Sequence, residues 1–226
     1  MRELPAGPDA VLLDFAADPD PAASVRAADH ALRIALSAGR LSTVTDVVPA
    51  AETVLITAES ESGIDILGIH RVLRADGVGT DTTAAEHAAT SDGPAIEIPV
   101  HYDGPDLDDV AAALGTDTAT VVALHHGTRW RVQFMGFAPG FGYLVPVDDP
   151  DNPLTTVGRR AEPRTHVGTG AVAIAAGYSA VYPKDSPGGW NILGHSDIGL
   201  WNIDTDPPSL LTPGALVRFR DAGGRP

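Results

Sequence analysis

Residues 171–193, AVAIAAGYSAVYPKDSPGGWNIL, decide the fold of the second half of the chain. Three short apolar runs, 171–175, 180–182 and 191–193, are separated there by segments that contain glycine and proline. Runs of this length, bounded by turn residues, predict strands. Many short strands joined by Gly/Pro turns are typical of a β-barrel or a β-sandwich.

The same pattern continues on both sides of this stretch. At 130–134, Trp130, Val132 and Phe134 alternate with polar residues, which predicts a half-buried strand. Two short helices are expected before it, one capped by Asp106 and ended by Gly115, and one over 118–125. Further strands are predicted at 95–100, 199–203 and 216–220.

The first third of the chain reads as a small α/β layer. Strands are predicted at 11–15, 43–48 and 53–57, and helices at 21–38 and 64–74. The first helix carries its start signals in the sequence, because Asp20 is a favourable N-cap and Pro21 suits the first helical position. Residues 76–93 have no periodic apolar signal and read as a linker, which predicts domains at 1–93 and 94–226.

Composition excludes several classes of protein. The formal net charge of −15 disfavours non-specific binding to nucleic acid and to anionic lipid. The chain has no cysteine, which excludes disulfides and thiolate chemistry. No apolar run approaches the roughly 20 residues of a membrane span, and no secretory signal is recognisable, so we expect a cytoplasmic protein.

Three segments are too unusual to be plain strand connections. Residues 136–144, GFAPGFGYL, either wall a pocket with aromatics or form a tight barrel corner. Residues 159–166, RRAEPRTH, either bind a carboxylate or phosphate or make surface ion pairs. Residues 182–190, YPKDSPGGW, either expose backbone N–H groups to an anion or form a wide hairpin.

The histidines do not form a recognisable metal motif. His125 and His126 are adjacent and would point apart on a helix, while His101, His166 and His195 are scattered along the chain. The sequence contains no HExxH, no G-x-S-x-G elbow and no strand-associated G-x-G-x-x-G. We therefore expect no metal site within this chain.

These segments resemble a family formed by the B subunits of prokaryotic 5-oxoprolinases, also called allophanate hydrolase subunit 1 or KipI-like proteins. Residues 136–144 are similar to its signature GF-x-PGF-x-YL, and residues 186–194 to its SPGGW-x-x-x-G block. Residues 159–164 resemble its twin-arginine element, and 98–103 its IPV-x-Y-D strand.

The chain departs from the family pattern at several positions. Gly158 stands where the family usually has proline, and His195 stands where arginine or another polar residue is common. Both changes fall beside the proposed anion-binding segments.

The resemblance implies an α+β protein in which a small two-layer α/β domain, 1–93, precedes a cyclophilin-like β-barrel, 94–226. It implies one component of an ATP-dependent enzyme that opens 5-oxo-L-proline to L-glutamate. The expected partners are the C subunit of that enzyme (KipA-like, or allophanate hydrolase subunit 2) and its A subunit, with ATP and Mg bound at a shared site. The alternatives are a KipI-like inhibitor of a sporulation-type histidine kinase and a carboxyltransferase-type subunit that uses urea-derived substrates.

Residue type suggests roles for these positions. Arg160 and Arg164 would stabilise charge on a transferring phosphoryl group, while Tyr143 and His125 would orient substrate or move a proton. No magnesium motif and no nucleophile is recognisable, which fits half of a site that a partner completes. The expected substrate- or phosphate-binding residues are Gly136, Pro139, Gly140, Phe141, Ser186, Gly188, Gly189 and Trp190.

Overall fold

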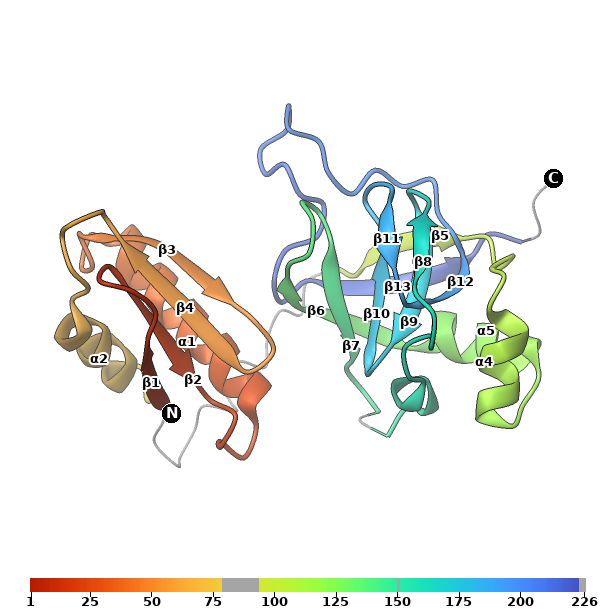
Figure 1. Ribbon diagram of the computed structural model, residues 1–226, viewed down its shortest axis with the longest axis horizontal. Coiled ribbons are helices and arrows are strands. Elements are labelled where there is room, and N and C mark those ends of the chain that lie inside the picture. Colours follow the sequence, from red (N-terminus) through yellow and green to blue (C-terminus); the bar gives the residue numbers. More distant parts are fainter. Residues whose placement is uncertain (79–93, 150, 224–226) are drawn as a thin grey trace. The chain divides into compact units, whose positions relative to one another are not determined.

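The computed structural model describes residues 1–78, 94–149 and 151–223 (Figure 1). The chain divides into two compact units, Met1–Thr90 and Ser91–Pro226, each with its own hydrophobic core. Most of the predicted linker, from residue 79 to 93, lies outside the described residues, and the predicted boundary at 93/94 stays a prediction.

The first unit is a four-stranded antiparallel sheet packed against two helices. The strand order is β1-β2-β4-β3, and α1 contacts β3, β4 and α2. Asp20 caps α1 as predicted, because its side chain accepts a hydrogen bond of 2.8 Å from the Ala23 amide. The elements are β1 (Arg2–Pro5), β2 (Ala10–Asp14), α1 (Pro21–Ser37), β3 (Val44–Pro49), β4 (Thr53–Ala58) and α2 (Ile66–Ala75).

The second unit is a nearly closed seven-stranded barrel. Its strand order is β12-β9-β10-β7-β6-β13-β5, in which only the β13–β5 pair is parallel. A bridge between His101 and His195 joins the end of β5 to the end of β12 and so connects the two edges of the sheet. Its elements are β5 (Ile96–Val100), α4 (Leu107–Leu114), α5 (Thr118–Gly127), β6 (Arg129–Met135), β7 (Gly142–Pro146), a 3-10 turn (Pro153–Thr156), β8 (Arg164–Val167), β9 (Ala171–Ala175), β10 (Tyr178–Val181), β11 (Ser186–Gly188), β12 (Asn191–His195) and β13 (Leu216–Asp221).

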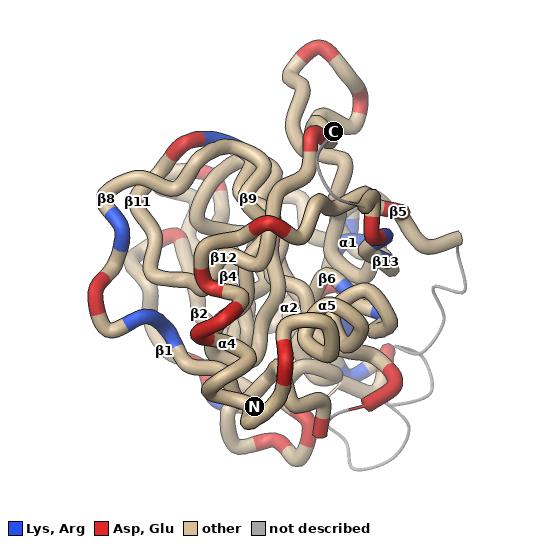
Figure 2. Tube along the Cα trace, turned by 90° about the vertical axis from the view of Figure 1, so that its right-hand side faces the viewer, with Lys and Arg blue, Asp and Glu red and all other residues tan. Residues whose placement is uncertain are grey.

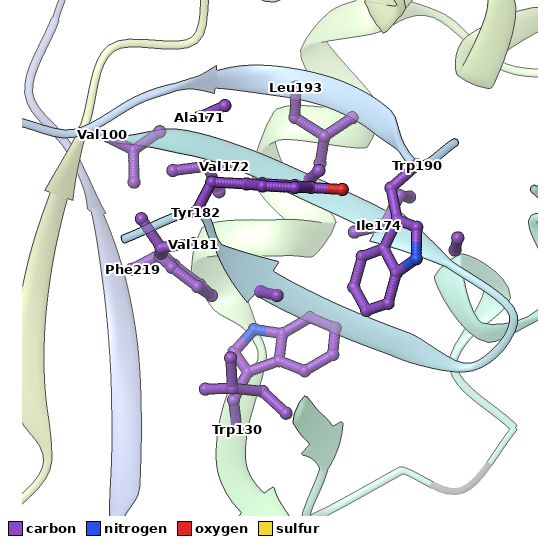
Figure 3. Close-up of a cluster of buried hydrophobic side chains, with 14 of the residues drawn as sticks. Val100, Trp130, Ala171, Val172, Ile174, Val181, Tyr182, Trp190, Leu193 and Phe219 are labelled. Carbon is purple, nitrogen blue, oxygen red and sulfur yellow. The ribbon is translucent and has the colours of Figure 1, made fainter. Parts of the chain in front are cut away.

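The barrel core is filled by side chains from strands far apart in the sequence. Trp130, Val172, Val181 and Phe219 face one another in the interior, and each is at most 1% exposed (Figure 3). Burying a large apolar side chain of this kind contributes roughly 1.5–3 kcal/mol. The fold class is therefore confirmed: a small two-layer α/β unit followed by a cyclophilin-like barrel.

One predicted strand is wrong. Residues 199–203 form a loop, in which Trp201 makes a single isolated bridge with Ser209. Only Leu200 enters the core, while Trp201 and Ile203 are 42% and 79% exposed. The apolar run therefore divides between core and surface and does not pair with a neighbouring strand.

Charge is spread over the molecule. Acidic segments are scattered along the trace of both units and are not gathered in one tail (Figure 2). None of the described helices is both long and apolar enough to cross a bilayer.

Candidate functional site

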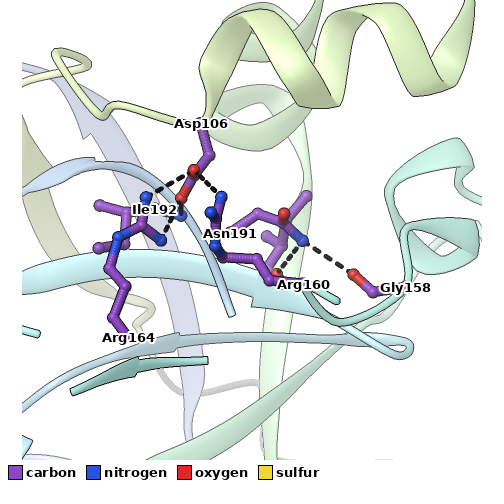
Figure 4. Close-up of polar contacts among 7 residues, drawn as sticks. Asp106, Gly158, Arg160, Arg164, Asn191 and Ile192 are labelled. Atoms are coloured by element: carbon purple, nitrogen blue, oxygen red, sulfur yellow. Dashed lines mark hydrogen bonds and ion pairs between the residues drawn. The ribbon is translucent and has the colours of Figure 1, made fainter. Parts of the chain in front are cut away.

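Asp106 is the centre of the candidate site (Figure 4). It occupies the N-cap of α4, but its side chain makes no capping hydrogen bond. Instead Oδ1 accepts from Arg160 and from Arg164 Nη2 (2.7 Å), while Oδ2 accepts from Arg164 Nη1 (2.9 Å) and the Ile192 amide (2.7 Å). The carboxylate is 2% exposed, so this arrangement, the Asp106 clamp, satisfies a buried charge with two guanidinium groups.

The two arginines reach Asp106 because their segment pairs with the Ser-Pro-Gly-Gly-Trp segment. Arg164 opens β8 and lies opposite Gly188 of β11, and the Arg160 amide donates to Gly189 O at 2.9 Å. Both arginine side chains remain about a quarter exposed, at 26% for Arg160 and 25% for Arg164. Hydrogen bonding to Asp106 raises the pKa of the Arg164 guanidinium above its ordinary value. Two cations share one anion, so the clamp keeps a net positive charge.

An aromatic cluster adjoins these segments through Trp190. The Trp190 ring lies 5.7 Å from Phe141 and 5.7 Å from Tyr143, and Phe141 lies 5.3 Å from Tyr182, all in edge-to-face geometry. Burial raises the pKa of the Tyr143 and Tyr182 hydroxyls, while the charge of Arg159 acts in the opposite direction on both. Both tyrosines are therefore neutral hydrogen-bond donors near neutral pH.

The glycine-rich loop at 136–142 needs its glycines for close approach. Gly140 has a φ of 83°, and a Cβ there would lie 3.0 Å from the Cβ of Trp201. The Gly136 amide donates to Phe141 O at 3.1 Å, which closes the turn. Pro139 and Phe137 remain exposed at the tip of this turn.

Residues 186–190 are more ordered than an open anion-binding turn. Ser186–Gly188 forms β11, which pairs with β8, so part of its backbone hydrogen bonding is used in that ribbon. A Cβ on Gly188 would lie 2.5 Å from the Tyr182 hydroxyl, which explains glycine there. The Ser186 Oγ is buried and has no hydrogen-bond partner among the described residues.

The structure thus brings together the three segments that sequence reasoning selected. Tyr143 and Phe141 contact Trp190, and Gly188 and Gly189 contact the segment that carries Arg160 and Arg164. Their individual roles in binding and catalysis stay predictions.

His125 lies elsewhere, in the core of the barrel. Its Nδ1 is 2.8 Å from the Tyr102 hydroxyl, its Nε2 is 2.8 Å from Ser179 Oγ, and its ring stacks on Phe219 at 4.3 Å. Burial, assisted by the nearby charge of His126, lowers the pKa of His125 to about 3. Because the buried ring is neutral and both of its nitrogens make hydrogen bonds, His125 orients the hydroxyl groups of Tyr102 and Ser179. The proton-transfer role of His125 stays a prediction.

A surface hollow of about 260 Å³ is lined by other residues. It is lined by residues around the end of α5, including Thr128, Arg129 and Asp148, and Arg129 is already paired with Asp148. None of its lining residues is a predicted site residue. We place the candidate site at the Asp106 clamp, because converging charged and polar groups indicate a functional site more strongly than a surface hollow does.

Sequence reasoning missed the part that Asp106 plays. The sequence predicts only a helix cap at this position, because Arg160 and Arg164 lie 54 and 58 positions away along the chain. The sequence feature that could have indicated this contact is the pair of arginines. A guanidinium group that becomes partly buried needs a nearby carboxylate.

The chain belongs to the family whose model is described as the carboxyltransferase domain, subdomain C and D, which matches residues 1–211. Curated relatives named as the B subunits of 5-oxoprolinase are 46% identical over 127 residues in Escherichia coli O157:H7 and 35% identical over 127 residues in Bacillus subtilis strain 168. Each match covers 55% of this chain, and 56% and 51% of those proteins respectively, so it spans about half of their length.

Solved structures agree with this assignment. TTHA0988 is 34% identical with a TM-score of 0.74, and the match covers 96% of this chain and 41% of that chain. PH0987 from Pyrococcus horikoshii is 30% identical with a TM-score of 0.52, and 97% of each chain is covered. The Kluyveromyces lactis urea carboxylase, 18% identical with a TM-score of 0.66 over 98% of this chain and 22% of that one, shares the fold.

Proposed function

We propose that this chain is the B subunit of a heteromeric ATP-dependent 5-oxoprolinase, which opens 5-oxo-L-proline to L-glutamate in the cytoplasm. The names of the curated relatives support the assignment. The structural observation that carries it is the Asp106 clamp, in which one buried carboxylate presents two guanidinium groups beside an aromatic cluster. Planar guanidinium donors suit the carboxylate of the substrate and the oxygens of a phosphoryl group.

The residues of the clamp match the chemistry of lactam opening. ATP, when bound, supplies a phosphoryl group that activates the otherwise poor lactam carbonyl. Arg160 and Arg164 would stabilise the negative charge on the moving group, and a fixed pair of donors does so without reorganisation cost. Tyr143, kept neutral by burial, would donate a hydrogen bond that orients the substrate.

The same residues do not fit a magnesium site. Both oxygens of Asp106 already accept hydrogen bonds from arginine and from the Ile192 amide. Mg²⁺ prefers carboxylate and water oxygens, and a positively charged clamp repels it. In our proposal the magnesium ligands belong to the A and C subunits of the enzyme, and the ATP site is shared.

Exposed apolar side chains support a partner contact near the clamp. Phe137 is 59% exposed at the tip of the loop that contributes Phe141, and Trp201 beside Gly140 is 42% exposed. Large apolar side chains gathered on a charged surface are typical of protein interfaces. We assign this face to the C subunit, the KipA-like partner.

The test is reconstitution with purified A and C subunits. The isolated chain should hydrolyse neither ATP nor 5-oxoproline, whereas the full assembly should form glutamate with ATP consumption. Within the assembly, Arg164→Ala should lower turnover by one or more orders of magnitude, because a charge-assisted contact to a transferring group contributes several kcal/mol. Arg164→Lys should recover part of the rate, since it restores the charge without the planar fork.

Arg218→Ala is the matched control, because Arg218 is exposed on β13 of the same unit and should leave turnover unchanged. Thermal melting of each variant checks that the barrel remains folded. Normal turnover of the folded Arg164→Ala assembly would remove the clamp from the mechanism, and no activity with any combination of the three proteins would remove the proposed function.

A carboxyltransferase component is the second candidate, because the family model is described as a carboxyltransferase domain. Such a protein would move a carboxyl group between a biotin carrier and a urea-derived substrate. Supplying the assembly with a carboxylated biotin carrier, in place of ATP, separates the two: only a carboxyltransferase would discharge it.

A further inference from the structure

We propose that His101, His195 and Asp197 form a binding site for one divalent transition-metal ion at the seam of the barrel. One ligand atom from each of these three residues lies within 4.8 Å of the other two. Donors around a tetrahedral zinc ion lie about 3.3 Å apart, given metal–ligand bonds of about 2.0 Å. An exposed aspartate and two half-buried imidazoles need only small side-chain rotations to close that difference.

The backbone places the two histidines side by side. The His101 amide donates to His195 O, and the His195 amide donates to His101 O, both at 2.9 Å. Residues that exchange both hydrogen bonds in an antiparallel pair point their side chains to the same face. The two imidazole rings accordingly stack, with centroids 5.1 Å apart and planes 22° apart.

The second nitrogen of each ring is already fixed by an oxygen acceptor. His101 Nδ1 lies 2.9 Å from Gly223 O, and His195 Nδ1 lies 2.8 Å from Asp103 Oδ1. A carbonyl and a carboxylate accept hydrogen bonds, so the neutral form of each ring carries its proton at Nδ1 and leaves the Nε2 lone pair for a ligand. Metal-binding histidines in proteins show this same arrangement, in which an oxygen behind the ring fixes its tautomer and orientation.

The donor set indicates the class of ion. Two imidazole nitrogens and one carboxylate oxygen suit Zn²⁺, Fe²⁺, Co²⁺ or Ni²⁺, whereas Mg²⁺ and Ca²⁺ prefer oxygen donors alone. Three protein ligands leave at least one coordination position for water or another ligand. The site shares no residue with the Asp106 clamp, and the inference does not depend on the proposed function. It departs from the expectation of no metal site that the sequence alone supported, because strand pairing is what brings His101 and His195 together.

The position of the site gives it a structural consequence. His101 follows β5, and His195 ends β12, and these are the two edge strands that the His101–His195 bridge brings together. An ion held by both residues would join the edges of the barrel a second time. Because the unfolded chain does not keep this pair together, binding should stabilise the folded state in proportion to ion occupancy.

The experiment uses the full chain without a polyhistidine tag, stripped with EDTA and dialysed. Titration with Zn²⁺ in a calorimeter should show one saturable ion per chain, and Zn²⁺ should raise the melting temperature of the barrel. Co²⁺ should give visible absorption bands typical of nitrogen and oxygen ligands. His195→Ala and His101→Ala should each weaken Zn²⁺ binding by roughly 100-fold or more, and Asp103→Asn, behind His195, by roughly 10-fold.

His126→Ala is the matched control, because His126 is an exposed histidine at the end of α5 and should leave binding intact. Absence of saturable Zn²⁺ and Co²⁺ binding to the unmodified chain would overturn the proposal. So would binding that survives His195→Ala unchanged, or binding that His126→Ala weakens equally, since either result places the ion elsewhere on the surface.

Discussion

The carboxylate of Asp106 stands at the N-terminus of α4, yet its oxygens turn away from the helix amides and toward two arginines. The sequence suggested a helix cap, and the backbone does begin the helix there. The side chain takes the other partners because guanidinium groups give stronger hydrogen bonds to a buried carboxylate than amides do. Sequence alone therefore located the helix and the arginines, but not the contact that holds them together.

Asp106→Ala should destabilise the barrel strongly. The change removes the acceptor of two arginines and of the Ile192 amide, and it leaves half-buried guanidinium groups without their counter-charge. Breaking a buried ion pair from one side costs about 3–5 kcal/mol, and partial exposure of both arginines places the expected loss near 3 kcal/mol. Urea denaturation monitored by tryptophan fluorescence measures it. Asp108→Ala, exposed in the first turn of the same helix, should change stability by no more than about 0.5 kcal/mol.

His125 should make the stability of the barrel depend on pH. Its pKa is lowered to about 3 in the folded state, whereas a free histidine titrates near 6.5. Between these values the unfolded chain binds a proton that the folded chain does not, so the free energy of unfolding falls as pH decreases. The expected slope approaches about 1.4 kcal/mol per pH unit for this one group.

Urea denaturation between pH 6.5 and 4.5 tests this slope. The barrel carboxylates Glu97, Asp117 and Asp185, whose pKa values are lowered in the folded state, also make stability fall toward the lower end of this window, but they contribute equally to the proteins compared and cancel in the difference. In His125→Gln the slope of the barrel transition should decrease by the contribution of one proton, while His70→Gln, in α2 of the first unit, should keep the slope of the unmodified chain. Identical slopes in all three proteins would mean that His125 is protonated in the folded barrel.

At the scale of elements, the segment 101–106 lies unusually close to β12. A Cβ on Gly194 would lie 2.1 Å from His101 O, and a Cβ on Gly104 would lie 2.2 Å from Ile192 O. Backbone contacts of this kind cannot be relieved by rotating a side chain. The two glycines therefore permit the close approach that joins the edges of the barrel and brings Asp106 to Ile192.

Gly194→Ala should weaken this seam. The added methyl group forces the two backbones apart and disturbs the His101–His195 bridge, with an expected loss of roughly 2 kcal/mol. Thermal denaturation and amide exchange at His101 and His195 both report it. Gly158→Ala is the control, because a Cβ there meets nothing within 4 Å, and its stability should stay unchanged. Equal melting temperatures for the two variants would contradict the close approach.

Strand prediction from sequence succeeded where burial and pattern agree. The runs at 171–175 and 216–220 correspond to β9 and β13, because their side chains are buried or alternate in register with neighbours. At β6 the alternation breaks after Val132, where the pairing with β7 shifts, so Phe134 leaves the core and stacks on Tyr143 at 4.3 Å. The short strands β8 and β11 carried no apolar pattern and were missed, since they pair mainly with each other as a two-stranded ribbon.

At the scale of the whole molecule, two separate hydrophobic cores could be predicted from the change of pattern along the chain. The first core gathers around Phe15, Leu32 and Ile56, and the second around Trp130 and Phe219. The contacts between residues of the candidate site could not be predicted in the same way. Asp106, Arg160 and Ile192 come together only when the barrel strands have paired in their final order.

A fragment comprising residues 94–226 should fold without the first unit. Over the described residues, its core is built from this unit alone, and the seven strands of its sheet include no strand of the first unit. A domain with a core of this kind is expected to unfold cooperatively by itself. The fragment should show one urea transition, with the same midpoint as the barrel transition of the full chain.

Asp106→Ala should shift that midpoint equally in the fragment and in the full chain. Leu32→Ala, in the core of the first unit, should leave the barrel transition of the full chain unchanged. An unfolded fragment, or a barrel transition that moves with Leu32→Ala, would show that the two units depend on each other for stability.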